Sequence, residues 1–105
     1  MSNELIEYFE AQAAALRSDV ERLVRFESPS TNKAAVDRCG AAVAELLREA
    51  GGDVALIPQR ERGDHVRATF DGGPGRVLLL GHFDTVWEVG TLERMPLREE
   101  DGRLF

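Results

Sequence analysis

The feature that most constrains this chain is an apolar run within residues 76–90, Arg-Val-Leu-Leu-Leu-Gly-His-Phe-Asp-Thr-Val-Trp-Glu-Val-Gly. Residues 77–80 are apolar without alternation, which predicts a strand covered on both faces, as in the middle of an α/β sheet. The run stops at Gly81. Any site that this strand serves should therefore begin directly after Gly81.

His82 and Asp84 follow the run. Side chains two apart on an extended backbone point the same way, so both should project from the carboxyl end of the strand, where open α/β sheets usually bind ligands. A neutral imidazole is a good Zn²⁺ ligand, and a carboxylate that accepts its other N–H fixes the tautomer. His82 is therefore a candidate metal ligand. The spacing leaves open whether Asp84 orients His82 or another ligand.

The His-x-Asp pair is a weak motif by itself, since chance should produce it in about one chain of this size in ten. The alternative interpretation is a histidine at a strand end that is hydrogen-bonded to an aspartate in a turn. The residues around the pair are needed to choose between the two.

Five segments carry a family resemblance: Leu-Leu-Leu-Gly-His-Phe-Asp-Thr-Val-Trp (78–87), Gly-Thr-Leu (90–92), Met-Pro-Leu (95–97), Leu-Val-Arg-Phe-Glu-Ser-Pro-Ser (23–30) and Asp-Gly-Arg-Leu-Phe (101–105). Together they resemble the zinc-dependent metallopeptidases and deacylases of the glutamate carboxypeptidase, acetylornithine deacetylase and succinyl-diaminopimelate desuccinylase family, with glutamate carboxypeptidase nearest. The resemblance implies that His82 binds one zinc ion. It also implies that Asp84 is a catalytic residue that supports the metal centre.

The resemblance implies an α/β fold, the amino-terminal portion of a three-layer αβα zinc-peptidase-like catalytic domain with a mixed sheet. The expected order is α-α-β-β-β plus a terminal hairpin. Residues 1–105 would be a partial catalytic domain, because the rest of that domain and the inserted dimerisation or lid domain come later in the family. The family's metal-bridging aspartate and its Glu-Glu pair with the general base also come later, so Glu99 and Glu100 are not that pair.

The implied reaction is metal-assisted hydrolysis of an amide or peptide bond next to a free carboxylate, in a small peptide or an N-acyl amino acid. Two zinc ions would share a water and polarise the carbonyl while a glutamate moves the proton. Since a catalytic zinc uses about three protein ligands, we expect this chain alone neither to bind zinc tightly nor to turn over substrate. The complete protein is a candidate homodimer.

Charge and composition exclude several other classes of protein. The net charge of −6 argues against a nucleic-acid partner, because no basic stripe is present to neutralise phosphates. No segment approaches the apolar length of a membrane span or has the pattern of a secretory signal, so a cytoplasmic location is expected, with no membrane partner. The single cysteine, Cys39, suits a reducing compartment and is expected to be a small buried hydrophobe.

The hydrophobic periods predict the remaining elements. A long first helix, capped by Ser2 or Asn3, should extend to about Phe26, and a second helix should run over residues 33–50. Strands at 53–58 and 65–70 should pair as a hairpin, residues 71–75 should form a turn, and a small hairpin should surround residues 101–102.

Three other side chains invite a functional interpretation. His65 opens a predicted strand beside a charged loop and is expected to be solvated, not a second ligand. Ser28 and Ser30 have the chemistry of nucleophiles, but no Gly-x-Ser-x-Gly elbow surrounds them. We assign a catalytic role to none of the three.

Three hypotheses remain open from the sequence. The chain is the amino-terminal part of a zinc carboxypeptidase or deacylase, or a free-standing, non-catalytic module that binds a partner along an exposed sheet edge, or a different metallohydrolase with a similar strand-end pair. The first predicts a bridging aspartate and a Glu-Glu pair beyond Phe105, whereas the second predicts a stop codon there.

Overall fold

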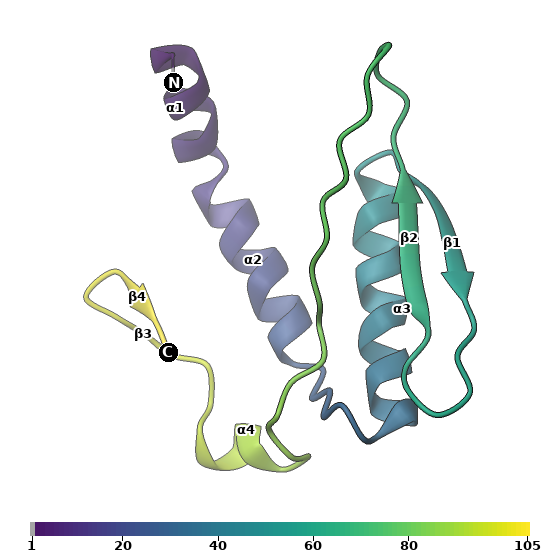
Figure 1. Ribbon diagram of the computed structural model, residues 1–105. Coiled ribbons are helices and arrows are strands. Elements are labelled where there is room, and N and C mark those ends of the chain that lie inside the picture. Colours follow the sequence, from purple (N-terminus) through teal and green to yellow (C-terminus); the bar gives the residue numbers. More distant parts are fainter. Residues whose placement is uncertain (1) are drawn as a thin grey trace.

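The fold combines helices with two small antiparallel sheets, which is consistent with the α/β class that was predicted (Figure 1). A computed structural model describes residues 2–105. The helices are α1 (Asn3–Ala11), α2 (Ala13–Val24), α3 (Lys33–Glu49) and α4 (Thr91–Arg94). The strands are β1 (Asp53–Ile57), β2 (His65–Thr69), β3 (Glu99–Glu100) and β4 (Arg103–Leu104), paired antiparallel as β1-β2 and β3-β4. Both hairpins were predicted.

The amino-terminal segment forms two helices where one was predicted. The Ser2 hydroxyl accepts the Leu5 N–H at 3.3 Å and so caps α1, as predicted. Gln12 has φ −92° and ψ 0°, a conformation that ends α1 and starts α2. No helix within residues 2–105 is both long and apolar enough to cross a bilayer.

Helix α3 packs on the β1-β2 hairpin and carries the core. The Asn32 side chain caps it by accepting the Ala35 N–H at 3.1 Å, and Gly51 follows its end with φ +95°, which favours glycine. The buried apolar residues have small side chains: Ala35, Val36, Cys39, Ala42 and Ala44. These small side chains permit close packing, and a Cβ at Gly40 would lie 3.1 Å from the ring of Phe83.

The loop between β1 and β2 is fixed by ionic and backbone contacts to α3. In the hairpin, Asp53 pairs with Thr69 and Ile57 pairs with His65. Asp64 accepts the Gln59 N–H at 2.9 Å and contacts Lys33 Nζ at 2.7 Å. The charged loop is thereby tied to the first turn of α3.

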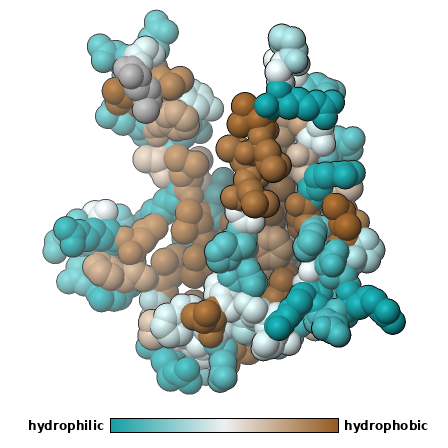
Figure 2. Space-filling model, viewed as in Figure 1, coloured by the Kyte–Doolittle hydropathy of each residue, from teal (hydrophilic) through white to brown (hydrophobic). Residues whose placement is uncertain are grey.

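The predicted buried strand at residues 77–80 is wrong for this structure. The segment is extended between α2 and β2, but it has no strand partner within residues 2–105 (Figure 1). Its four side chains are 83–91% exposed and form a brown column in Figure 2. An apolar run needs neighbours on both faces to be buried, and the elements described here supply none.

Residues 2–105 are less compact than is usual for a folded domain of this length. Its radius of gyration is 15.9 Å, against about 13 Å for a compact domain of this length. Its accessible surface is 8682 Å², against about 5,800 Å² for a folded monomer of this mass. Large apolar side chains on α1, α2 and residues 77–80 are among those exposed on this surface.

Candidate functional site

The candidate site is held by a contact between two segments that lie far apart in the sequence. Pro29 and Thr85 form a parallel β-bridge. The Thr85 N–H donates to the Ser28 carbonyl at 2.8 Å, and the Ser30 N–H donates to the Thr85 carbonyl at 3.0 Å. This pairing fixes the backbone directly after His82.

The two serines of the Glu-Ser-Pro-Ser segment reinforce this bridge with their side chains. Ser28 is only 2% exposed, and its hydroxyl donates to the Phe83 carbonyl at 2.7 Å. The Ser30 hydroxyl donates to Asp84 Oδ2 at 2.6 Å. Sequence reasoning considered both hydroxyls only as nucleophiles and missed these contacts. The available signal was the family-like Glu-Ser-Pro-Ser segment itself, to which no role had been attached.

His82 and Asp84 project together, as the spacing predicted. His82 Nδ1 lies 3.2 Å from Asp84 Oδ1 and 3.1 Å from the Asp84 carbonyl oxygen. Both neighbours are acceptors when the carboxylate is ionised, so a neutral His82 ring carries its proton on Nδ1. The imidazole side chain is 84% exposed, and Nε2 makes no hydrogen bond to the described part of the chain. Nε2 therefore keeps a free lone pair.

Asp84 is an ionised carboxylate at neutral pH. The hydrogen bond from Ser30 is the largest influence that lowers the pKa of Asp84 below its ordinary value. Partial desolvation opposes this effect, and the contact with His82 adds to it. The carboxylate accepts from Ser30 through one oxygen and faces His82 with the other.

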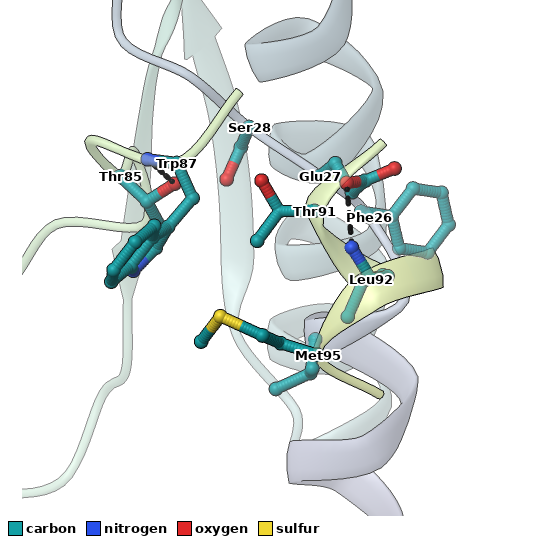
Figure 3. A pocket seen from close by; sticks show the side chains of 9 residues that line it. Phe26, Glu27, Ser28, Thr85, Trp87, Thr91, Leu92 and Met95 are labelled. Atoms are coloured by element: carbon teal, nitrogen blue, oxygen red, sulfur yellow. Dashed lines mark hydrogen bonds between the residues drawn. The ribbon is translucent and has the colours of Figure 1, made fainter. Parts of the chain in front are cut away.

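A second carboxylate, that of Glu27, binds the backbone of residues 90–92, which follow the site in the chain. Glu27 Oε2 accepts the Gly90 N–H at 2.8 Å and, at the start of α4, the Leu92 N–H at 3.2 Å. Figure 3 shows the contact with Leu92. Gly90 has φ +102°, a conformation that favours glycine. A carboxylate is favourable at a helix amino terminus because the unpaired N–H groups there carry partial positive charge. Helix α4 was not predicted from the sequence.

A mostly apolar pocket of about 250 Å³ lies beside the site (Figure 3). Trp87 lines it and is 56% exposed, so this ring does not cover a closed core. Neither His82 nor Asp84 lines the pocket, although their neighbour Thr85 does. The lining residues are Val24, Phe26, Glu27, Ser28, Thr85, Trp87, Thr91, Leu92 and Met95.

The described residues contain one candidate metal ligand and no assembled metal cluster. No group of three or more His, Cys, Asp or Glu side chains suited to one ion occurs in residues 2–105. His65 is exposed on β2, as expected for a solvated histidine. Cys39 is buried, which raises the pKa of its thiol, while a weaker hydrogen bond with Ser28 opposes the shift. Cys39 is therefore a protonated core residue at neutral pH.

A scan against models of known protein families finds no match for this sequence. The family resemblance accordingly depends on the five sequence segments in which it was found.

Proposed function

We propose that this chain is the amino-terminal part of a zinc-dependent metallopeptidase or deacylase of the glutamate carboxypeptidase type. In this proposal the fold continues into a three-layer αβα catalytic domain with a mixed sheet. The substrate class is a small peptide or an N-acyl amino acid with a free carboxylate next to the scissile bond. His82 is one zinc ligand, and Asp84 supports it.

The single observation that carries the proposal is the arrangement of His82. Its Nδ1 faces the Asp84 carboxylate at 3.2 Å, while the ring is 84% exposed and Nε2 is open. Zinc-binding histidines typically donate their other ring N–H to a carboxylate, which orients the ring and raises its basicity. The pair fits the donor chemistry of one zinc ligand and its supporting group.

The exposed apolar surface supports the view that further protein completes this domain. Residues 77–80 have the composition of a strand with two covered faces, yet their side chains are 83–91% exposed. Exposed apolar patches of this kind mark surfaces that another part of a protein covers. Strands on either side of residues 76–82 would satisfy their backbone groups and bury these side chains.

The residues of this chain perform positioning, and the remaining groups of the reaction come from outside it. Zinc, when bound, supplies a water with a lowered pKa and polarises the scissile carbonyl. His82 contributes one of the roughly three protein ligands that a catalytic zinc needs. Asp84 holds the His82 proton on Nδ1, so that the lone pair of Nε2 remains free to bind the metal. The chain alone is therefore expected to be inactive.

The coding sequence beyond Phe105 provides the first test. A continuing frame should encode a bridging aspartate and a Glu-Glu pair. A continuing frame without them would refute the proposal.

A His82→Ala variant provides the second test, in the complete protein. It should lose at least one equivalent of zinc, measured by atomic emission, and almost all hydrolysis of N-acyl amino acids and small peptides. His65→Ala is the matched control. It should retain both zinc and hydrolysis, because His65 is exposed on β2 and is not a proposed ligand. Unchanged metal content and rate in His82→Ala would exclude His82 as a ligand.

The second candidate function is a non-catalytic module that binds a partner through the exposed extended segment. The observation that favours it is that residues 77–80 lack a strand partner within residues 2–105. Open strand edges recruit strands from other chains. A stop codon after Phe105 would favour this function over the first.

A further inference from the structure

We infer that Ser30 is a positioning residue that holds the Asp84 carboxylate and thereby keeps the His82 proton on Nδ1, with Nε2 left open. The inference rests on the proposed function only for the identity of the metal. The hydrogen-bonded chain Ser30–Asp84–His82 is formed by the side chains of the protein alone.

The two oxygens of Asp84 have separate partners. Oδ2 accepts the Ser30 hydroxyl at 2.6 Å, and Oδ1 lies 3.2 Å from His82 Nδ1. A carboxylate without a fixed partner rotates about its terminal bond, because such torsions are broad. The short bond from Ser30 restricts this rotation and keeps Oδ1 directed at the ring. The orientation of Asp84 thus depends on a residue 54 positions earlier in the chain.

Ser30 is itself well anchored. Its N–H donates to the Thr85 carbonyl at 3.0 Å, and its own carbonyl accepts from Arg62 Nη1 at 3.2 Å. The hydroxyl has a second possible acceptor in the Thr85 carbonyl oxygen, at 3.1 Å. It has only one proton, and the closer, charged acceptor is Asp84 Oδ2. The donor is therefore presented to Asp84 from a fixed backbone.

Ser28 offers a comparison within the same segment. Its hydroxyl also crosses to the site loop, but it donates to the Phe83 carbonyl and does not reach Asp84. If the serines only docked the two segments together, both should influence His82 alike. If Ser30 acts through the Asp84 carboxylate, only the loss of the Ser30 hydroxyl should affect His82.

The test measures the His82 tautomer in the full chain without metal. The ring nitrogens of ¹⁵N-histidine-labelled protein report which nitrogen carries the proton, at about pH 8.5, where ordinary imidazoles are neutral. A His65→Gln variant assigns the two sets of signals. Wild type should show the Nδ1–H form of His82. In Ser30→Ala the ratio of Nδ1–H to Nε2–H should fall, by at most about fivefold, which is the factor for complete loss of one hydrogen bond of ordinary net strength between Asp84 and His82.

Three further variants make the result specific to the carboxylate. Ser30→Thr retains the hydroxyl and should restore the wild-type ratio, whereas Ser28→Ala should leave the ratio at the wild-type value. In an Asp84→Asn background, Ser30→Ala should have no further effect, because the group through which Ser30 acts is gone. Far-ultraviolet circular dichroism identifies any variant that fails to fold.

Two outcomes overturn the inference: a wild-type tautomer ratio in folded Ser30→Ala, or an equal change in Ser28→Ala. Both tautomer ratios are measured in protein without added metal, so the result is independent of the proposed function. Loss of zinc in His82→Ala tests the proposed function, and the tautomer of His82 tests the role of Ser30.

Discussion

Removing the Glu27 carboxylate should loosen the loop that leads into α4. This carboxylate accepts two backbone N–H groups, from Gly90 at 2.8 Å and Leu92 at 3.2 Å. A hydrogen bond to a charged group contributes about 1.5–3 kcal/mol. Glu27 is half-buried and the second bond is long, so the lower end of that range is appropriate for the first bond and less for the second. Together they give about 2 kcal/mol of local stability for the segment.

Amide hydrogen exchange measured by NMR reports this local stability directly. In Glu27→Ala, a loss of about 2 kcal/mol should accelerate exchange at Gly90 and Leu92 by roughly 30-fold. Glu27→Gln keeps a neutral acceptor and should give an intermediate acceleration, because neutral hydrogen bonds are weaker than charge-assisted ones. Amides in the middle of α3 should change little in either variant.

Glu21→Ala is the matched control for the loss of a glutamate from the same part of the chain. The Glu21 carboxylate pairs with Arg25 and has no hydrogen bond or ion pair to the loop in the described part of the chain. Its removal should leave exchange at Gly90 and Leu92 unchanged. Equal protection of these two amides in Glu27→Ala and wild type would refute the claim that Glu27 fixes the loop.

The remaining predictions concern association, packing and pH. Leu79→Glu should reduce self-association in sedimentation velocity and change stability by no more than about 0.5 kcal/mol, because the side chain is 91% exposed. Gly63→Ala should lower the free energy of unfolding, measured in urea, by about 1–3 kcal/mol, because the added Cβ would meet a valine of α3. Gly72→Ala should leave the free energy of unfolding unchanged, because a Cβ there would meet open space. The hydrogen bond from the Lys33 ammonium lowers the pKa of Asp64. This stabilisation should be fully present above the ordinary aspartate pKa and should be lost as pH falls below that value through the lowered pKa of the folded protein. Lys33→Met should therefore flatten the acid limb of the stability curve.

A specific result would contradict each of these predictions. A wild-type chain that is already a monodisperse, cooperatively melting monomer would contradict both the association prediction and the need for a completing partner. Equal stability of the two glycine variants would contradict the close contact at Gly63. An acid limb that is identical in wild type and Lys33→Met would show that the Lys33–Asp64 pair contributes nothing to folding.

Local signals in the sequence predicted the local elements. The apolar period predicted α3 at residues 33–50, and the structure ends this helix with local features, the Asn32 cap and Gly51 in a left-handed conformation. The alternation in residues 53–58 and 65–70 predicted a hairpin, and the structure pairs residues 53–57 with 65–69. The spacing of His82 and Asp84 predicted that they project together, because that depends on the backbone between them.

Features that depend on distant partners escaped prediction or were wrong. Helix α4 has only four residues, and its amino-terminal N–H groups bind Glu27, which lies 63–65 positions earlier in the chain. No local sequence pattern therefore predicts this helix. The contacts of Ser28 and Ser30 likewise span 54–55 positions. The apolar run at 77–80 indicated burial on both faces, which requires neighbours that residues 2–105 do not provide.

The bridge between Pro29 and Thr85 also sets an order for folding. It closes a loop that contains α3 and the whole β1-β2 hairpin, and the entropy cost of closing a flexible loop rises with its length. Prior collapse of α3 onto the hairpin shortens the flexible part of that loop and lowers the cost. The surroundings of His82 should therefore be assembled late, after the helix–hairpin unit, and should be among the first parts of the molecule to open.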